Sequence, residues 1–377
     1  MRLPGGAMWG SMGLIAWTHV GYPIAVGLLA NRRPPVASGV GQELPSVTLI
    51  IAAHNEETVI RERLLNALAL DYPAARLSIV VSLDGSTDAT ATIASDFEAR
   101  GVTVLDNPRG GKVAAQNAAV RATSSDVVAF SDANSMWEPD ALRRLVEPLE
   151  DPAVGYVCGQ LRLVDPASGE NVEGRYWAFE LWLRLQESRL GSITAGNGAI
   201  YAVRRAAYPE LGPGQSHDIG LPFRLRRAGL RSLYAPGAVA VEPAAPTSGA
   251  EWERKVRMLS RAWHDVLTGG MLDPRGLPPG YYAGLLSHRL LRYATGPLHV
   301  VAFALALGSR RPGARFVAAL HTAWLGLAMV GRRGGQSNPL AAFAWYYLVV
   351  TGASLAGLMR MLREGPQVTW TPVEGTR

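Results

Sequence analysis

Four long apolar stretches constrain this chain more than any other feature of its sequence. They cover Met8–Ala30, Leu290–Leu307, Ala314–Val330 and Pro339–Leu362. About 20 apolar residues in a helix cross the hydrocarbon core of a bilayer, so three of the stretches are long enough or nearly so. The third has only 17 residues, which makes it marginal as a full span. We therefore expect one membrane helix near the N-terminus and about three near the C-terminus.

The first apolar stretch is followed at once by Arg32 and Arg33. A cleaved signal peptide is the alternative, but the basic pair stands after the run and no small-x-small site precedes it, which favours an uncleaved anchor. The positive-inside rule then leaves the N-terminus outside and the following domain in the cytoplasm. The loop charges around the later stretches do not settle their orientation. We expect a multi-pass protein of the cell (inner) membrane with a cytoplasmic catalytic domain.

The composition agrees with partial burial in a lipid bilayer. Hydrophobic residues make up 48% of the 377 residues and charged residues only 18%. The net charge of +6 is spread as scattered arginines without long basic runs, which favours anionic lipid or phosphate ligands and no nucleic acid. The single cysteine, Cys158, excludes an internal disulfide and a cysteine-based zinc cluster. We divide the chain into an anchor and linker (1–40), a central domain (41–267) and a C-terminal membrane domain (268–377).

The central domain alternates short apolar runs with amphipathic segments, which is typical of an α/β domain with a parallel sheet. We expect strands at Val47–Ala53, Leu77–Leu83, Val102–Leu105 and Val127–Phe130. The intervening helices are expected at Glu56–Leu70, Thr87–Arg100, Gly111–Ala122 and Pro139–Leu149. Open α/β sheets bind ligands at the carboxyl ends of their strands.

The fourth expected strand leads directly into Asp132 and Asn134. Two oxygen-bearing side chains at this spacing can aim into one crevice, and hard cations such as Mg2+ are held by one or two such oxygens plus substrate phosphates. The alternative is that the two residues shape a turn or cap the helix that begins near Pro139.

Further polar residues are expected at the same edge of the sheet. Asp84 ends the second apolar run and can accept a hydrogen bond from a base or ribose, although capping by Ser86 or Thr87 explains part of this cluster without a ligand. The third connection places Gly110, Gly111 and Lys112 at the start of a helix, which suits a phosphate group. The spacing is not that of a Walker loop, so an NTPase is not indicated.

The segments PSVTLIIAAHNEE, SLDGSTDAT, RGGKVAAQNAA and FSDANS, in this order, resemble the family 2 inverting glycosyltransferases with the GT-A fold. The membrane-bound, cellulose-synthase-like branch is the most similar, and the resemblance covers roughly Pro45–Glu242. It implies a GT-A (Rossmann-like) nucleotide-sugar-binding domain flanked by transmembrane helices. The nucleotide sugar would be held by the following residues: Ala53, Asn55, Glu56, Asp84, Lys112 and Asp132.

The resemblance also implies a divalent cation, Mg2+ or Mn2+, held by the Asp-x-Asp element of the family. Here the element is Asp132-Ala133-Asn134. Asn134 replaces the second carboxylate, which keeps an oxygen ligand but removes a charge.

The acceptor side and the base follow from the same resemblance. Gly196, Asn197 and Gly198 look like the acceptor-side turn of the family, although glycines also serve a bare structural turn. Asp218 matches the Asp of the Glu-Asp element, which acts as the general base. Its alternative role is to cap the helix that it opens.

A basic amphipathic helix is expected at Glu251–Leu267. It could lie on the inner membrane surface, or Arg257, Arg261 and Trp263 could close over the diphosphate. Processive members of the family carry Gln-x-x-Arg-Trp hereabouts, and this chain has Arg261-Ala262-Trp263 instead. We place Arg261 and Trp263 on the acceptor side.

Residues and resemblance together predict an enzyme that transfers a sugar, with inversion, from a nucleotide diphosphate sugar to a glycan or lipid-linked acceptor. Transfer to a polyprenyl phosphate is the alternative among enzymes. A catalytically idle nucleotide-binding membrane protein is the alternative from another class, and Asn134 and the altered Arg-x-Trp segment favour it. The sequence does not identify the sugar, the base of the donor, the acceptor or the linkage.

Overall fold

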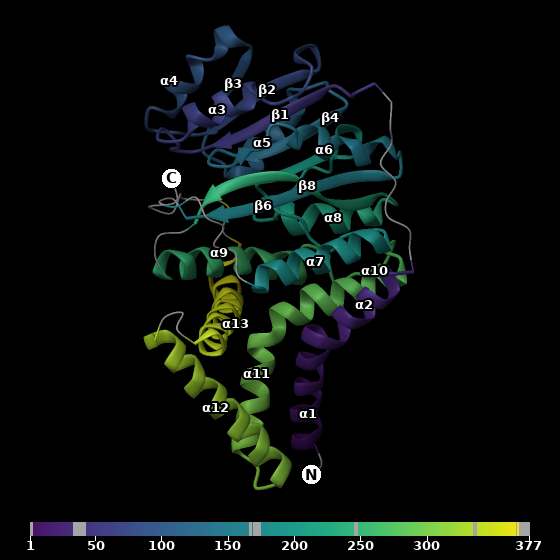
Figure 1. Ribbon diagram of the computed structural model, residues 1–377, viewed down its shortest axis with the longest axis vertical. Coiled ribbons are helices and arrows are strands. Elements are labelled where there is room, and N and C mark those ends of the chain that lie inside the picture. The colour runs from purple at the N-terminus through teal and green to yellow at the C-terminus, as the bar shows by residue number, and fades with distance from the viewer. Residues whose placement is uncertain are drawn as a thin grey trace.

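An eight-stranded sheet stands on a set of long apolar helices (Figure 1). The computed structural model describes residues 3–32, 43–165, 168, 175–244, 248–334, 338–366 and 368. The expected linker at Pro34–Pro45 and the boundary at residues 40 and 41 lie largely outside the described residues.

The sheet has the strand order β3-β2-β1-β4-β7-β6-β8-β5. Its strands are β1 (Val47–Ala53), β2 (Leu77–Asp84), β3 (Val102–Asn107), β4 (Val127–Asp132), β5 (Met136–Trp137), β6 (Val154–Val164), β7 (Ile200–Arg204) and β8 (Arg231–Pro243). The first four run parallel, and β7 pairs antiparallel with β4. Every residue of β1 is buried, as expected for a strand covered on both faces by helices.

The four strands expected from the sequence are confirmed, and three of them extend further. β2 ends at Asp84, β3 at Asn107 and β4 at Asp132. In the sheet register, Ala53 lies beside Leu83 and Ala52 beside Asp132. The carboxyl ends of β1, β2 and β4 therefore meet at one edge of the sheet.

The first four helices of this α/β part are shorter than the sequence patterns predicted: α3 (Ile60–Leu68), α4 (Thr90–Ser95), α5 (Lys112–Arg121) and α6 (Ala141–Val146). The later helices are α7 (Arg175–Leu190), α8 (His217–Arg227) and α9 (Ser248–Leu267), of which α9 begins before the expected Glu251. The first helix begins at Ile60 and not at Glu56, because Asn55 takes the left-handed backbone conformation (φ 54°) and the chain turns before it coils.

Four helical segments in the described part of the chain are long and apolar enough to cross a membrane. They span Gly5–Ala30, Pro279–Leu307, Pro312–Arg333 and Pro339–Glu364. The third is 22 residues long, so the expectation of a marginal span was wrong. These segments contain α1 (Leu3–Ala16), α2 (Tyr22–Ala30), α10 (Pro279–Gly284), α11 (Leu291–Leu307), α12 (Pro312–Gly334) and α13 (Pro339–Glu364). Large apolar side chains on them are exposed, for example Leu28 at 62% and Phe316 at 65%, as expected of lipid-facing positions.

Polar side chains within these apolar helices are paired with one another. The Nδ1 of His321 lies 2.9 Å from the carbonyl oxygen of Val317, which only accepts, so Nδ1 carries a hydrogen. His299 lies 3.0 Å from His321 on one side and 2.9 Å from the Tyr347 hydroxyl on the other. This chain of hydrogen bonds joins α11, α12 and α13, as buried polar groups do in membrane bundles.

Between the sheet and the long apolar segments lie α7 and α9 (Figure 1). The apolar face of α9 packs against α13, and a third buried cluster of the molecule includes residues of α8, α9, the Pro279–Leu307 segment and α13. Figure 1 shows α13 nearly end-on, so it runs across the long axis that α1, α11 and α12 follow.

Candidate active site

Asp84 holds the turn that leads into α5. One carboxylate oxygen accepts hydrogen bonds from the backbone N–H groups of Gly110 (2.7 Å) and Gly111 (2.8 Å), and the other lies 3.0 Å from the Arg109 guanidinium. Asp84 is only 1% exposed. In this structure its oxygens are engaged by the turn, so Asp84 shapes the edge of the sheet and places the N-terminus of α5.

The end of the described chain reaches the same turn. Gly111 has a φ of 89°, which favours glycine, and a Cβ built there would lie 2.2 Å from the carbonyl oxygen of Val368. Pro366 packs in the same way against Gly214, just before α8. The segment after α13 therefore lies beside the start of α5.

The loop after β1 is tied to the loop after β2. The side-chain oxygen of Asn55 accepts a hydrogen bond from the backbone N–H of Thr87 (2.9 Å), and the backbone N–H of Glu56 donates to the Thr90 hydroxyl (2.7 Å). Ala53 and Glu56 are completely buried, whereas Asn55 is partly exposed. Of these three predicted nucleotide-binding residues, the structure leaves only the Asn55 side chain near the surface.

Asp132 ends β4 and forms an ion pair with Lys112, the first residue of α5. Asn134 lies two residues further on and is buried. Glu242 on β8 accepts a hydrogen bond from the Ser135 hydroxyl. Burial and then the negative charge of Asp132 raise the pKa of Glu242, so the two carboxyl groups are close to one another. In the sequence, Glu242 marks only the end of the family resemblance.

These oxygen-bearing groups fit a hard divalent cation. In the part of the chain that the structure describes, no group of three or more His, Cys, Asp or Glu residues could hold a metal ion. Mg2+ is commonly bound by one or two carboxylates together with substrate phosphates, so Asp132 and Asn134 meet that requirement without a complete protein cage. The ion pair with the Lys112 ammonium shows that a positively charged group can reach the Asp132 carboxylate.

The predicted acceptor-side turn lies between Lys112 and Asp218. The backbone N–H of Gly196 donates to the carbonyl oxygen of Asp218 (2.7 Å), and a Cβ on Gly198 would lie 3.7 Å from Nζ of Lys112. A Cβ on Gly196 would meet the Tyr156 hydroxyl at 2.0 Å, so only glycine fits there. The Asn197 side chain is used within the turn, since its oxygen accepts from the backbone N–H groups of Ala199 (3.1 Å) and Ile200 (2.9 Å). Asn197 therefore builds the turn, which was the structural alternative.

Asp218 lies in the first turn of α8, after the N-cap residue Ser216. Within the described residues, no hydrogen bond to its carboxylate is found, so its oxygens are open to a ligand. Burial lowers the pKa of the Arg261 guanidinium, and the carboxylates of Asp218 and Asp265 act in the opposite direction, which places these three charges together.

Tyr201 on β7 connects the two halves of the site. Burial raises the pKa of its phenol, and the charges of Asp132 and Asp218 both add to the effect. Its neighbour His217 is buried against Tyr201 and Phe130. Burial, with the charges of Lys112 and Arg261, lowers the pKa of His217 to about 3, so its imidazole is neutral at pH 7. The structure thus brings Asp132, Lys112, Asp218 and Arg261 around one core of aromatic rings.

The placement of Trp263 on the acceptor side was wrong for this structure. Its indole is only 5% exposed, and its N–H donates to the carbonyl oxygen of Ser354 in α13 (3.0 Å). A ring held in this way packs against the apolar helices and has no free face for a sugar. Arg261, on the same helix, remains beside Asp218.

Asp265 is a further carboxyl group that the sequence pattern did not mark. It is completely buried on α9, and one of its oxygens accepts hydrogen bonds from the backbone N–H (3.2 Å) and the hydroxyl of Ser216. Burial raises the pKa of Asp265 to about 7, against hydrogen bonds from Ser216 that lower it.

Replacing Asp265 with asparagine is expected to flatten the pH dependence of stability. The folded protein binds the Asp265 proton between the ordinary value of 3.8 and about 7, where the unfolded chain has lost it. Stability therefore falls as the pH rises through this window, by an amount on the order of a few kcal/mol. Thermal unfolding of the detergent-solubilised protein at pH 5 and pH 8 measures the difference, which should shrink in Asp265→Asn. An equal difference in both proteins contradicts the assignment.

The comparisons with known proteins agree with this geometry. Residues 48–212 match the model of the family described as "Glycosyl transferase family 2". The chain is 29% identical over 235 residues to "Probable glycosyltransferase YdaM" of Bacillus subtilis (strain 168), covering 57% of this chain and 55% of that protein. It is 27% identical over 244 residues to an "N-acetylglucosaminyltransferase" of Rhizobium leguminosarum bv. viciae, covering 59% and 57%. It is 26% identical over 246 residues to "Poly-beta-1,6-N-acetyl-D-glucosamine synthase" of Staphylococcus aureus (strain COL), covering 63% and 58%.

A solved structure matches nearly the whole chain. The mannosyltransferase PcManGT from Pyrobaculum calidifontis, in complex with GDP-Man and Mn2+, aligns with a TM-score of 0.72 over 95% of this chain and 99% of its own, at 23% identity. The sheet with its flanking apolar helices therefore has the GT-A fold. Residues 48–212 of this chain are similar to the family 2 glycosyltransferases, and the chain spans little more than half the length of the curated relatives named above.

Proposed function

We propose that this chain is a membrane-bound inverting glycosyltransferase that transfers a sugar from a nucleotide diphosphate sugar to a glycan or lipid-linked acceptor. One observation carries the proposal: the Gly196–Gly198 turn lies against Asp218 at one end and near Lys112, the ion-pair partner of Asp132, at the other. Asp132, a proposed metal ligand, and Asp218, whose carboxylate has no hydrogen bond among the described residues, would then lie around one place where donor and acceptor can meet. The proposed domains are 1–40, 41–267 and 268–377, as expected from the sequence.

Asp218 is the proposed general base. Inverting transfer needs one carboxylate to take the proton of the acceptor hydroxyl as that oxygen attacks the anomeric carbon from the face opposite the leaving group. The carboxylate of Asp218 is free of hydrogen bonds among the described residues, and the Arg261 guanidinium lies near it. The Gly196 turn, hydrogen-bonded to the backbone of Asp218, would hold the acceptor against it.

Asp132 and Asn134 are the proposed ligands of a divalent cation, Mg2+ or Mn2+. When bound, such a cation offsets the charge that grows on the leaving diphosphate. Lys112, at the N-terminus of α5, would contact the same diphosphate, with Asn55 and the loop held by Asp84 around the nucleoside. Glu242, close to Asp132, adds a second carboxylate where the Asp-x-Asn element has lost one.

The similarity to the N-acetylglucosaminyltransferase of Rhizobium leguminosarum and to the poly-N-acetylglucosamine synthase of Staphylococcus aureus favours an N-acetylglucosamine donor and a glycan acceptor. Membership of the cellulose-synthase-like branch is part of the proposal. Polyprenyl phosphate as acceptor is the second candidate.

The test is a panel of radiolabelled nucleotide sugars offered to the detergent-purified protein with and without Mn2+. Cation-dependent release of sugar from one donor supports the proposal, and addition of polyprenyl phosphate separates the two acceptors. Donor binding without any turnover, with or without acceptor, would instead mark a catalytically idle nucleotide-binding protein.

The domain at 41–267 is proposed to face the cytoplasm of a cell (inner) membrane protein, on the side where nucleotide sugars are made. Protease added to intact cells is therefore expected to leave this domain uncut, and permeabilised cells should show cleavage. The basic pair Arg32 and Arg33 after the first span supports this orientation. Cleavage within the domain in intact cells would reverse it.

A further inference from the structure

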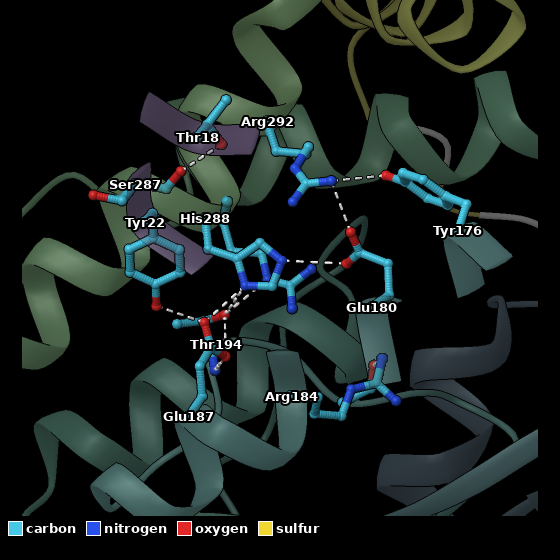
Figure 2. Close-up of polar contacts among 12 residues, drawn as sticks. Thr18, Tyr22, Tyr176, Glu180, Arg184, Glu187, Thr194, Ser287, His288 and Arg292 are labelled. Atoms are coloured by element: carbon cyan, nitrogen blue, oxygen red, sulfur yellow. Dashed lines mark hydrogen bonds and ion pairs between the residues drawn. The ribbon is translucent and has the colours of Figure 1, made fainter. Parts of the chain in front are cut away.

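Glu187 of α7 lies where the membrane helices, α7 and the acceptor-side turn meet (Figure 2). One of its carboxylate oxygens accepts a hydrogen bond from the Tyr22 hydroxyl (2.7 Å) and lies 2.7 Å from Nδ1 of His288. The other accepts from both the backbone N–H (3.0 Å) and the hydroxyl (2.9 Å) of Thr194. Each oxygen thus has two partners, and the residue is only 3% exposed.

The charge of Glu187 is stabilised although the carboxyl group is buried. Burial alone would raise its pKa, but His288, Arg289 and the hydrogen bonds outweigh this effect and lower the pKa to about 2. An ionised carboxylate accepts only, so it holds its donors at fixed places. Arg289 also donates to the Thr194 hydroxyl (2.9 Å). Thr194 is therefore bound from α7 and from the second membrane segment together.

Thr194 connects Glu187 to the segment that contacts the proposed base, Asp218. It stands two residues before Gly196, whose backbone N–H donates to the carbonyl oxygen of Asp218. Hydrogen bonds thus connect Tyr22 in the first span to Glu187 and Glu187 to Thr194, and the backbone from Thr194 to Gly196 completes the connection to Asp218.

Glu180 provides an internal comparison on the same helix. It lies 3.2 Å from the other ring nitrogen of His288 and accepts from Arg292 (2.8 Å), and Arg292 also donates to the Tyr176 hydroxyl (3.0 Å). Figure 2 shows these contacts on the side of His288 that faces away from Thr194. Glu180 therefore ties α7 to the membrane helices, but none of its hydrogen bonds reaches the turn.

We propose that Glu187 is a positioning residue that sets the acceptor-side turn, Thr194–Gly198, against Asp218 from the membrane helices. It contacts neither donor nor acceptor and acts through Thr194. The inference rests on the proposed glycosyltransferase function. Loss of this carboxylate should leave the donor site unchanged and misplace the acceptor.

The test uses the full chain in lipid nanodiscs and compares Glu187→Gln with Glu180→Gln. The side-chain amide of glutamine accepts hydrogen bonds only at its oxygen, and its nitrogen donates. Glu187→Gln must therefore lose part of its contacts with Thr194, Tyr22 or His288. We expect donor affinity and acceptor-independent donor hydrolysis to stay within about twofold of the wild type. Transfer to acceptor should fall roughly 10- to 100-fold, the usual effect of misplacing a reactant by about 1 Å. Glu180→Gln should keep transfer close to the wild-type rate.

Two substitutions at Thr194 separate positioning from a general loss of packing. Thr194→Val removes the hydroxyl and keeps the shape, so it should reproduce the transfer defect. Thr194→Ser keeps the hydroxyl and should restore transfer. Hydrogen exchange of the Thr194 and Gly196 amides should quicken in Glu187→Gln and not in Glu180→Gln.

Three results would overturn the inference. They are unchanged transfer in Glu187→Gln, an equal loss of donor affinity and transfer in that variant, or an equal transfer defect in Glu180→Gln. If the wild-type protein turns over no donor at all, the proposed function fails, and the amide exchange alone then decides whether Glu187 fixes the turn.

Discussion

Asp218→Asn is expected to lower sugar transfer roughly 10²- to 10⁴-fold while donor binding stays intact. This is the usual contribution of a positioned general base, and the amide cannot take a proton from the acceptor hydroxyl. Asparagine is nearly isosteric and suits the start of a helix as well as aspartate does, so α8 should remain folded. The measurement is the transfer rate at saturating donor, beside the donor dissociation constant.

A carboxylate at another helix start provides the matched control for that substitution. Asp140 immediately precedes α6, whose buried residues belong to a different core cluster from those of α8, and Asp140→Asn should change neither transfer nor donor binding. Thermal unfolding of both variants shows whether either substitution weakens its helix. Transfer at the wild-type rate in folded Asp218→Asn would remove Asp218 from the mechanism.

Asp132→Ala is expected to abolish cation-dependent donor binding together with turnover. Asn134 then offers one neutral oxygen to a hard cation, and Lys112 loses its ion-pair partner. We expect donor affinity in the presence of Mn2+ to fall to the level seen without it. Calorimetric titration of donor with Mn2+, with Mg2+ and with neither measures the effect directly.

The opposite end of the same strand offers a control for damage to the sheet. Asp126 stands just before β4 and accepts hydrogen bonds from the backbone N–H and hydroxyl of Ser46. Asp126→Ala should lower thermal stability and leave the cation dependence of donor binding unchanged. Tight donor binding with an unaltered need for Mg2+ or Mn2+ in Asp132→Ala would contradict the assignment of Asp132 as a ligand of the cation.

The parallel half of the sheet could be predicted from the sequence because its strands are buried on both faces. Val47–Ala53 and Val127–Phe130 are continuous apolar runs, and the polar residues after them mark the edge where a ligand binds. The same logic brought Lys112 and Asp132 to one place, where the structure has their ion pair. The family resemblance added the role proposed for Asp218, which spacing alone does not give.

The rest of the site depends on contacts between distant segments, which periodicity does not encode. Glu242 reaches Asp132 because β8 pairs with β6 through irregular register, and no local pattern marks that pairing. Trp263 was misplaced because an amphipathic pattern shows that α9 has an apolar face and does not show that α13 covers it. Glu187 and His288 are 101 residues apart, and each looks like an ordinary polar residue within its own segment.

The contact between Val368 and Gly111 limits how many times the chain can cross the membrane after the central domain. A chain that leaves the central domain after Leu267 and touches it again at Val368 crosses the bilayer an even number of times in between. Three apolar helical segments stand in that interval, so one of them does not traverse the bilayer. The orientation of α13 fits this role, because α13 lies across the direction of α11 and α12 and packs against α9 through contacts such as Arg360 with Glu253 (3.3 Å). A helix in this orientation, packed under α9, brings Val368 beside Gly111 at the start of α5.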